Sequence, residues 1–217
     1  MRSNEDRFAA RTIGLETNYI SFTHSFRSDL HLSLLGGYLE EMYGGAGGEI
    51  LYRPYKARWA IGAESWLALK RDPETMLNTG FNGDHLLTGH INGWYDLPMI
   101  DATLHAKAGR YLAEDFGATL ALQKTFRNGV QMEGFITVTD AADYDLFGGT
   151  THAYNGLKLS VPLGGYKYAP ENSHIKIKAA PFGRDTGQTL NNPLPLYELT
   201  EKFSERHMAD YWDEIAQ

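Results

Sequence analysis

The chain has 217 residues, with 20 Lys and Arg against 27 Asp and Glu, and a formal net charge of −7. It has no basic run that could follow a phosphate backbone, which argues against nucleic acid as a partner, and no cysteine, which excludes disulfides and thiol chemistry. No apolar stretch is long enough for a transmembrane helix, and the first residues lack the apolar region of a signal peptide.

Alternation of apolar and polar residues dominates the chain from Tyr19 to Leu163. Along the chain it is clearest in YISFTHSF, LHLSLLGGYL, WAIGAESWLALK, LTGHINGWY, ATLHAKAG and VQMEGFITVT. Each segment has one apolar face and one polar face, as a β-strand does. The pattern predicts an all-β, antiparallel, up-and-down fold of about nine strands.

The connections between these strands are expected to alternate in length. Tight ones are expected at Arg27–Asp29, Arg53–Ala57, Leu97–Asp101 and Arg127–Gly129, and longer polar ones at Glu40–Gly47, Asp72–His85, Leu112–Phe116 and Asp140–His152. The glycine run Gly44–Gly48 is expected to form the first long turn. Short turns at one end and long loops at the other are typical of an outer-membrane β-barrel.

Aromatic residues on the apolar face gather beside the tight turns. They are Phe26, Tyr52, Trp59, Tyr95 and Phe126. Such a row predicts an aromatic girdle at a membrane–water interface, although aromatic residues also flank turns in soluble sheets.

Alternation alone does not separate a membrane barrel from a soluble one, in which the apolar face points inward. Many small residues lie on the apolar face, among them Ala63, Ala106 and Gly134, and they would leave a protein core underfilled. Lipid chains can fill such gaps, so we favour an apolar face that points outward. The exceptions, His24 and Lys124, lie close to tight turns, where a long side chain can snorkel to the interface.

Four longer motifs resemble a known family. They are YLEEMYGGAGGEILYRP, AGRYLAEDFGATL, YNGLKLSVPL and PFGRDTGQTL. They resemble the YjbH family of exopolysaccharide-biosynthesis outer-membrane proteins, called GfcD-like in some capsule operons. The resemblance implies a Gram-negative outer-membrane β-barrel that serves exopolysaccharide or capsule biosynthesis and secretion, together with other proteins of the same operon and the lipid around it.

Family members are much longer and carry a secretion signal, so the resemblance also implies that this chain is the C-terminal portion of such a protein. An odd number of strands agrees with a partial barrel, because bacterial single-chain barrels close with an even number. We expect a lead-in over residues 1–16, the barrel portion over 17–163 and a tail over 164–217.

Within the tail, HIKIKA could form a short strand, PFGRDTGQTLNNPLP reads as a turn-rich connector, and the spacing of Leu199, Phe203 and Trp212 predicts an amphipathic helix between Leu196 and Ile215. The apolar stripe of this helix could dock on its own chain, plug the barrel or bind a partner protein.

The polar face supplies candidate lumenal contacts for polysaccharide, through hydrogen bonds and aromatic stacking. They are Glu64, Trp66, Lys70, His90, Asn92, Trp94, His105, Lys107 and Glu133. A water-filled lumen lined with mixed charges explains the same residues. Two carboxylates flanking a sugar could instead hydrolyse it. No catalytic or cofactor signature with local spacing is present, so we expect a non-enzymatic protein without cofactor or metal.

Charged residues also gather at the end with the longer connections. We expect Arg110 to pair with Glu114, with Asp115 or with Glu40 or Glu41 of the first loop, so that a rim clamp joins neighbouring hairpins; solvated surface charges are the alternative. Two other functions stay open for the whole chain. One is a barrel enzyme acting on envelope polysaccharide or lipid, and the other is a soluble periplasmic carbohydrate-binding β-domain.

Overall fold

The computed structural model describes residues 7–8, 14–75, 77, 79–126, 128–144, 149–163, 174–181, 184–201 and 204. These residues form one sheet of ten antiparallel strands, each paired with its neighbours in sequence. The strands are β1 (Asn18–Ser25), β2 (Leu30–Tyr38), β3 (Tyr43–Tyr52), β4 (Trp59–Asp72), β5 (Gly80–Leu97), β6 (Ala102–Arg110), β7 (Phe116–Thr125), β8 (Gln131–Tyr144), β9 (Thr150–Pro162) and β10 (His174–Ala179); the helix α2 (Leu196–Glu201) follows.

The prediction of an all-β, up-and-down antiparallel fold is confirmed, with ten strands rather than about nine. The additional strand is β10, the HIKIKA segment, which pairs with β9 beyond the predicted barrel portion 17–163. Strands β1 and β10 form the two edges of an open sheet. Of the helix predicted from Leu196 to Ile215, the part up to Glu201 is present as α2, while Phe203 and Trp212 lie outside the described residues, as does most of the lead-in 1–16.

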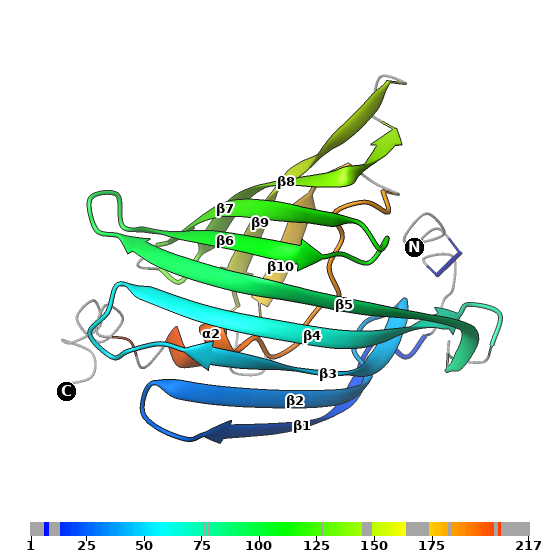
Figure 1. Cartoon of the computed structure of the whole chain (residues 1–217), viewed down its shortest axis with the longest axis horizontal. Helices are drawn as coiled ribbons and strands as arrows, with labels where there is room; N and C mark the ends of the chain where they lie inside the picture. Colours follow the sequence, from blue (N-terminus) through cyan, green and yellow to red (C-terminus); the bar gives the residue numbers. More distant parts are fainter. Residues whose placement is uncertain are drawn as a thin grey trace.

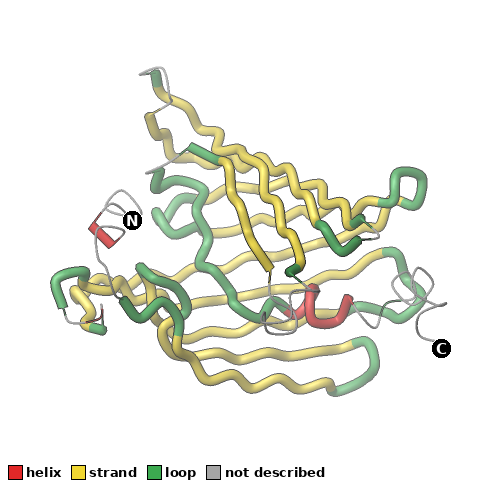
Figure 2. The backbone as a smooth tube through the Cα atoms, turned by 180° about the vertical axis from the view of Figure 1, so that it is seen from behind, coloured by secondary structure: helices red, strands yellow, loops and turns green. Residues whose placement is uncertain are grey.

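The sheet is curled, so that β9 and β10 come round behind β5, β6 and β7 (Figure 1). Helix α2 and the loop that precedes it lie on the hollow side (Figure 2). We refer to this side as the inner face and to the other side as the outer face. The curvature follows the right-handed twist that antiparallel strands accumulate across a wide sheet.

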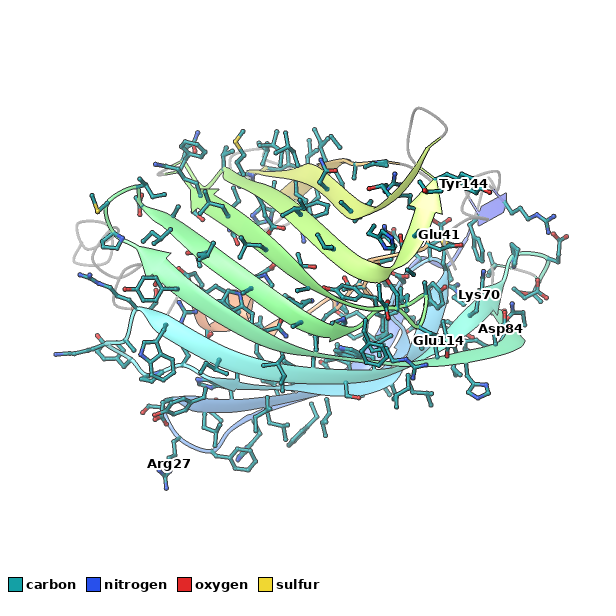
Figure 3. All side chains as sticks on the ribbon, turned by 45° about the horizontal axis from the view of Figure 1, so that its top comes forward. Arg27, Glu41, Lys70, Asp84, Glu114 and Tyr144 are labelled. Carbon is teal, nitrogen blue, oxygen red and sulfur yellow. The ribbon has the colours of Figure 1, made fainter. Side chains whose placement is uncertain are left out.

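Side chains alternate between the two faces, but the exposed ones are apolar, which is the reverse of the usual arrangement for a protein in water. In β5 the outward Ile91 is 67% exposed while the inward Asn92 is 3% exposed, and in β4 Leu67 is 43% exposed while Trp66 is 2% exposed. The apolar side chains of the central strands stand out from the ribbon in Figure 3. The polar parity of the sequence therefore points into the hollow of the sheet.

The connections differ from those predicted. One end of the sheet carries the connections from β1 to β2, from β3 to β4, from β5 to β6 and from β7 to β8, and the other end carries those from β2 to β3, from β4 to β5, from β6 to β7 and from β8 to β9. The expected contrast between tight turns and long loops is wrong, because β3, β5, β8 and β9 extend into three of the four segments expected as loops, and the fourth, Leu112–Phe116, is itself short. Figure 3 shows Arg27 at the first end, here named the tight-turn rim, and Glu114 at the second, here named the opposite rim.

The prediction that the glycine run Gly44–Gly48 forms a turn is wrong. The run lies within β3, paired with β2 and β4. A Cβ atom at Gly47 would lie 2.5 Å from Cε3 of the Trp66 indole, and one at Gly45, where φ is 152°, would clash with the Leu67 carbonyl oxygen. The glycines are needed because β3 passes close to β4 and to a large buried ring. The turn itself is the short segment 39–42.

Two apolar clusters lie on the inner face. The larger contains Phe8, Leu35, Leu39, Met42, Tyr43, Trp66, Ala68, Leu112 and Leu190. The smaller contains Leu51, Ala60, Leu196 and Tyr197, with Trp94 against it. Both clusters include residues of the segment that follows β10, so this segment is part of the core.

Candidate functional site

The inner face carries all of the residues predicted as lumenal contacts. Among them Trp66, Lys70, His90 and Asn92 are buried, and the others are partly buried. The alternation within each strand places them on one face, and the antiparallel register brings them level across the sheet. Glu49 of β3, Glu64 of β4 and His90 of β5 stand directly opposite one another in one row.

Glu64 is the centre of a hydrogen-bonded group. Its Oε1 accepts from Nζ of Lys107 at 3.0 Å and lies 3.1 Å from Nδ1 of His90, and its Oε2 accepts from Nε1 of Trp66 at 3.2 Å. The Glu64 side chain is about one-tenth exposed. Three predicted residues thus surround the carboxylate of a fourth, Glu64, and stabilise it.

A second group lies further towards the tight-turn rim. Nε2 of His105 is 3.0 Å from Oδ1 of Asn92. The His105 ring stacks on one side of Trp94, with centroids 4.9 Å apart, and the ring of Tyr197 also stacks on Trp94, at 4.6 Å. Glu133 is set apart from both groups and pairs with Lys158 at 2.7 Å. Trp66 and Trp94 are therefore in contact with other residues of this chain.

The segment Arg184–Glu201, here named the strap, crosses the inner face (Figure 2). Near the opposite rim the amide of Gly187 donates to Oδ2 of Asp115 at 2.8 Å, and the amide of Asn191 donates to Oε2 of Glu40 at 3.2 Å. In mid-sheet the amide of Leu196 donates to Oε2 of Glu49 at 2.9 Å.

At the tight-turn rim Arg53 holds the end of the strap. Its guanidinium donates to the Tyr197 carbonyl oxygen at 3.1 Å, bonds to the Glu201 carboxylate and lies over the Tyr197 ring. Burial raises the pKa of the Tyr197 phenol, which keeps this ring neutral. A cavity of about 620 Å³ adjoins this point, lined by Arg53, Lys56, Asp96 and Thr200 among others.

The sequence prediction missed the strap and its anchors Arg53, Glu49 and Asp143. Asp143 accepts from the amide of Asp185 at 3.1 Å. The segment was expected as a connector because its turn residues carry no periodic signal, and contacts this distant in sequence leave no local pattern.

The residues predicted to form the rim clamp make two separate sets of contacts. Arg110 pairs with Glu114 at 2.8 Å, as one of the predicted pairings, but this contact lies within a single hairpin. Glu40 and Asp115 instead hold the strap through the hydrogen bonds given above, while Glu41 is exposed. The strap, rather than Arg110, links the two loops.

The predicted girdle residues Phe26, Tyr52, Trp59, Tyr95 and Phe126 are all exposed beside turns of the tight-turn rim. Tyr52 and Trp59 are in ring contact, with centroids 5.8 Å apart. Among the described residues, no group of His, Asp and Glu has the arrangement of a metal site. Within the same part, no helix has the length and apolar character needed to cross a membrane.

Comparisons with known proteins support the family resemblance of the sequence. The model of the YjbH family, described as exopolysaccharide biosynthesis protein YbjH, matches residues 1–202. The chain is 34% identical over 188 residues to the uncharacterized lipoprotein YjbH of Escherichia coli K12, covering 86% of this chain and 26% of that protein. The chain thus spans about a quarter of the length of this curated relative. No solved structure matches. The chain belongs to the YjbH family of exopolysaccharide biosynthesis proteins.

Proposed function

We propose that the chain forms part of an outer-membrane β-barrel of a Gram-negative bacterium, a non-enzymatic component of exopolysaccharide or capsule biosynthesis and secretion. The observation that carries this proposal is the inverted sheet. Outward apolar side chains of the central strands are exposed, among them Ile61, Leu67, Leu87, Ile91, Leu120, Ile136 and Val138. Contiguous apolar surface of this kind is unusual in water and is what acyl chains cover in a barrel.

Residues at the tight-turn rim support the same orientation. The exposed aromatic residues there have the placement of an interfacial girdle. Lys124, a cation on the apolar parity, extends along the outer face so that its Nζ donates to the Ile100 carbonyl oxygen in the neighbouring turn, at 2.9 Å. A charge on the lipid side is expected to reach the rim in this way.

The open edges of the sheet support a larger barrel. Within the residues that the structure describes, β1 pairs with β2 and β10 with β9, so a further strand could pair with the other side of each. The Escherichia coli relative is about four times as long as the matched region and is named a lipoprotein, which favours attachment to the cell envelope. We infer that further strands complete the barrel, and that lipid, exopolysaccharide and other proteins of the operon are its partners.

A non-enzymatic role is supported by the contacts of the two neighbouring acids. Lys107, His90 and Trp66 hold the Glu64 carboxylate, and the Glu49 side chain opposite it accepts from Asn192 and from the Leu196 amide, so both acids have structural partners.

The outward orientation is tested by Ile91→Arg, with Met99→Arg as the matched control. Met99 is 96% exposed in the turn between β5 and β6, so an arginine there meets water in either account. If lipid covers the outer face, Ile91→Arg lowers the free energy of unfolding from phospholipid vesicles by about 2–4 kcal/mol and reduces the inserted fraction. An effect below about 0.5 kcal/mol, equal to that of the control, would show that water covers this face.

A further inference from the structure

We propose that the part of the inner face covered by the strap, here named the track, is the binding surface for an uncharged or amino-sugar glycan. The strap leaves this track when the glycan binds. The inference rests on the proposed function and adds to it the chemical class of the polymer. The strap is held by hydrogen bonds to acidic side chains and by aromatic stacking, and a polyhydroxylated chain could be held by the same contacts.

The strap is bound largely by carboxylates. Its amide groups donate to the side chains of Asp143, Asp115, Glu40 and Glu49, which come from β8, from two loops of the opposite rim and from β3. One of these carboxylates, Glu49, also accepts from Nδ2 of Asn192 at 3.2 Å. In each of these hydrogen bonds a sugar hydroxyl or ammonium group can replace the donor.

An aromatic platform lies next to the carboxylates. Trp94 is stacked between His105 and Tyr197, with interplanar angles of 4° and 7°. Since Tyr197 belongs to the strap, departure of the strap uncovers one face of the indole. A flat aromatic face beside hydrogen-bond acceptors suits a pyranose ring, which has apolar C–H faces and a polar edge.

Buried polar atoms on the same face have hydrogen-bonding capacity that the strap does not use. Among the described residues, Oδ1 of Asp115 and Nε2 of His90 are buried and have no hydrogen-bond partner. His90 is 4% exposed and its ring contacts Tyr111, which lies in the same loop as Asp115. Unsatisfied groups of this kind are uncommon inside a protein, and at a binding surface they point to a ligand that the strap replaces only in part.

The charge of the track decides the class of glycan. The carboxylates of Asp143, Asp115 and Glu40 are accompanied by Arg53, which binds Glu201 of the strap. Lys107 is engaged by Glu64, Lys158 is engaged by Glu133, and Arg71 donates to the carbonyl oxygens of Glu40 and Leu15. A polymer of uronic acids would be repelled by these three carboxylates. Hydroxyl groups and the ammonium groups of amino sugars are accepted.

Arg53 is the latch that keeps the strap in place. It contacts three strap residues, Tyr197, Thr200 and Glu201, and belongs to the turn after β3, outside the carboxylate row. The cavity beside it opens at the end of the track. Removing the latch therefore weakens the strap while it leaves the proposed glycan contacts intact.

The test compares Arg53→Ala with Arg27→Ala, an exposed arginine in the neighbouring turn of the same rim. Binding of a glucosamine hexamer, of maltohexaose and of a galacturonate hexamer is measured by calorimetry on the full chain in detergent, and hydrogen exchange is measured on strap peptides. We expect Arg53→Ala to accelerate strap exchange and to raise the affinity for the first two oligosaccharides by at least about tenfold, because a larger fraction of the protein is competent to bind. Arg27→Ala should match the parent chain.

A variant with faster strap exchange and no gain in affinity would overturn the track, and an equal gain for the galacturonate hexamer would overturn the assigned class. Glu201→Gln, which weakens the latch from the strap side, serves if Arg53→Ala does not fold; unchanged exchange in the folded variant would overturn displacement. The Ile91→Arg comparison does not involve the strap, so failure of the track leaves the outward orientation to its own test.

Discussion

The two faces of β4 and β5 are built from the same strands, yet their environments are specified in different ways. On the outer face, Ile61, Leu67 and Ile91 are exposed, and their position follows from parity along the strand alone. On the inner face, Trp66 and Asn92 are buried, and what covers this face includes a strap more than 80 residues further along the chain. The comparison teaches that strand alternation encodes which side chains share a face, while burial depends on distant segments.

The largest expected difference between the faces is at the tryptophans. Trp66→Ala removes a ring that is almost completely buried in the larger apolar cluster, and we expect a loss of about 3–5 kcal/mol in the free energy of unfolding. Trp59→Ala, on the outer face, should cost about 1 kcal/mol or less. Urea unfolding followed by far-UV circular dichroism checks both, and equal losses would contradict the assignment of faces.

The ion pairs of the inner face sharpen the comparison. Glu64→Gln leaves Lys107 without its carboxylate in a buried setting, so we expect a loss of about 3 kcal/mol. Glu133→Gln, whose partner Lys158 is half-exposed, should cost about 1 kcal/mol or less. The double variant Glu64→Gln/Lys107→Met should recover part of the loss; a Glu64→Gln protein as stable as Glu133→Gln would refute the buried group.

Two glycines, one in β3 and one in β5, provide a closer comparison. A Cβ atom at Gly47 would collide with Trp66, whereas one at Gly93 meets nothing within 4 Å. We expect Gly47→Ala to destabilise the sheet by about 1–3 kcal/mol and Gly93→Ala to change stability by about 0.5 kcal/mol or less. The same unfolding measurement decides, and a neutral Gly47→Ala would mean that β3 does not pass so close to the Trp66 ring.

The smallest effect is expected at the opposite rim. The Arg110–Glu114 pair is solvent-exposed and lies within one hairpin, so Arg110→Ala should change stability by about 0.5 kcal/mol or less and should leave assembly intact. If Arg110→Ala lost the folded, protease-resistant form, this expectation would be wrong and the rim clamp predicted from the sequence would be supported. Asp115→Asn serves as the contrast, because Asp115 anchors the strap and should have the larger effect.

Much of the fold was predictable because strand periodicity is a local signal. The parity of Glu64, His90 and Lys107 was sufficient to place them on one face, but their contacts depend on strand register, which the alternation did not specify. The glycine run was assigned to a turn because glycine is common there, whereas the need for glycine opposite Trp66 arises from packing between strands. The strap was missed because its anchors pair residues far apart in sequence, such as Leu196 with Glu49.

The central claim is that the outer face meets lipid, and a spin label at Ile91→Cys tests it most directly. The chain has no native cysteine, so the label is unique. In vesicles the account predicts frequent collisions with oxygen and rare collisions with a water-soluble nickel chelate, while a label at Met99→Cys shows the reverse. Free access of the nickel chelate to the label at position 91 in the folded, vesicle-associated chain would contradict it.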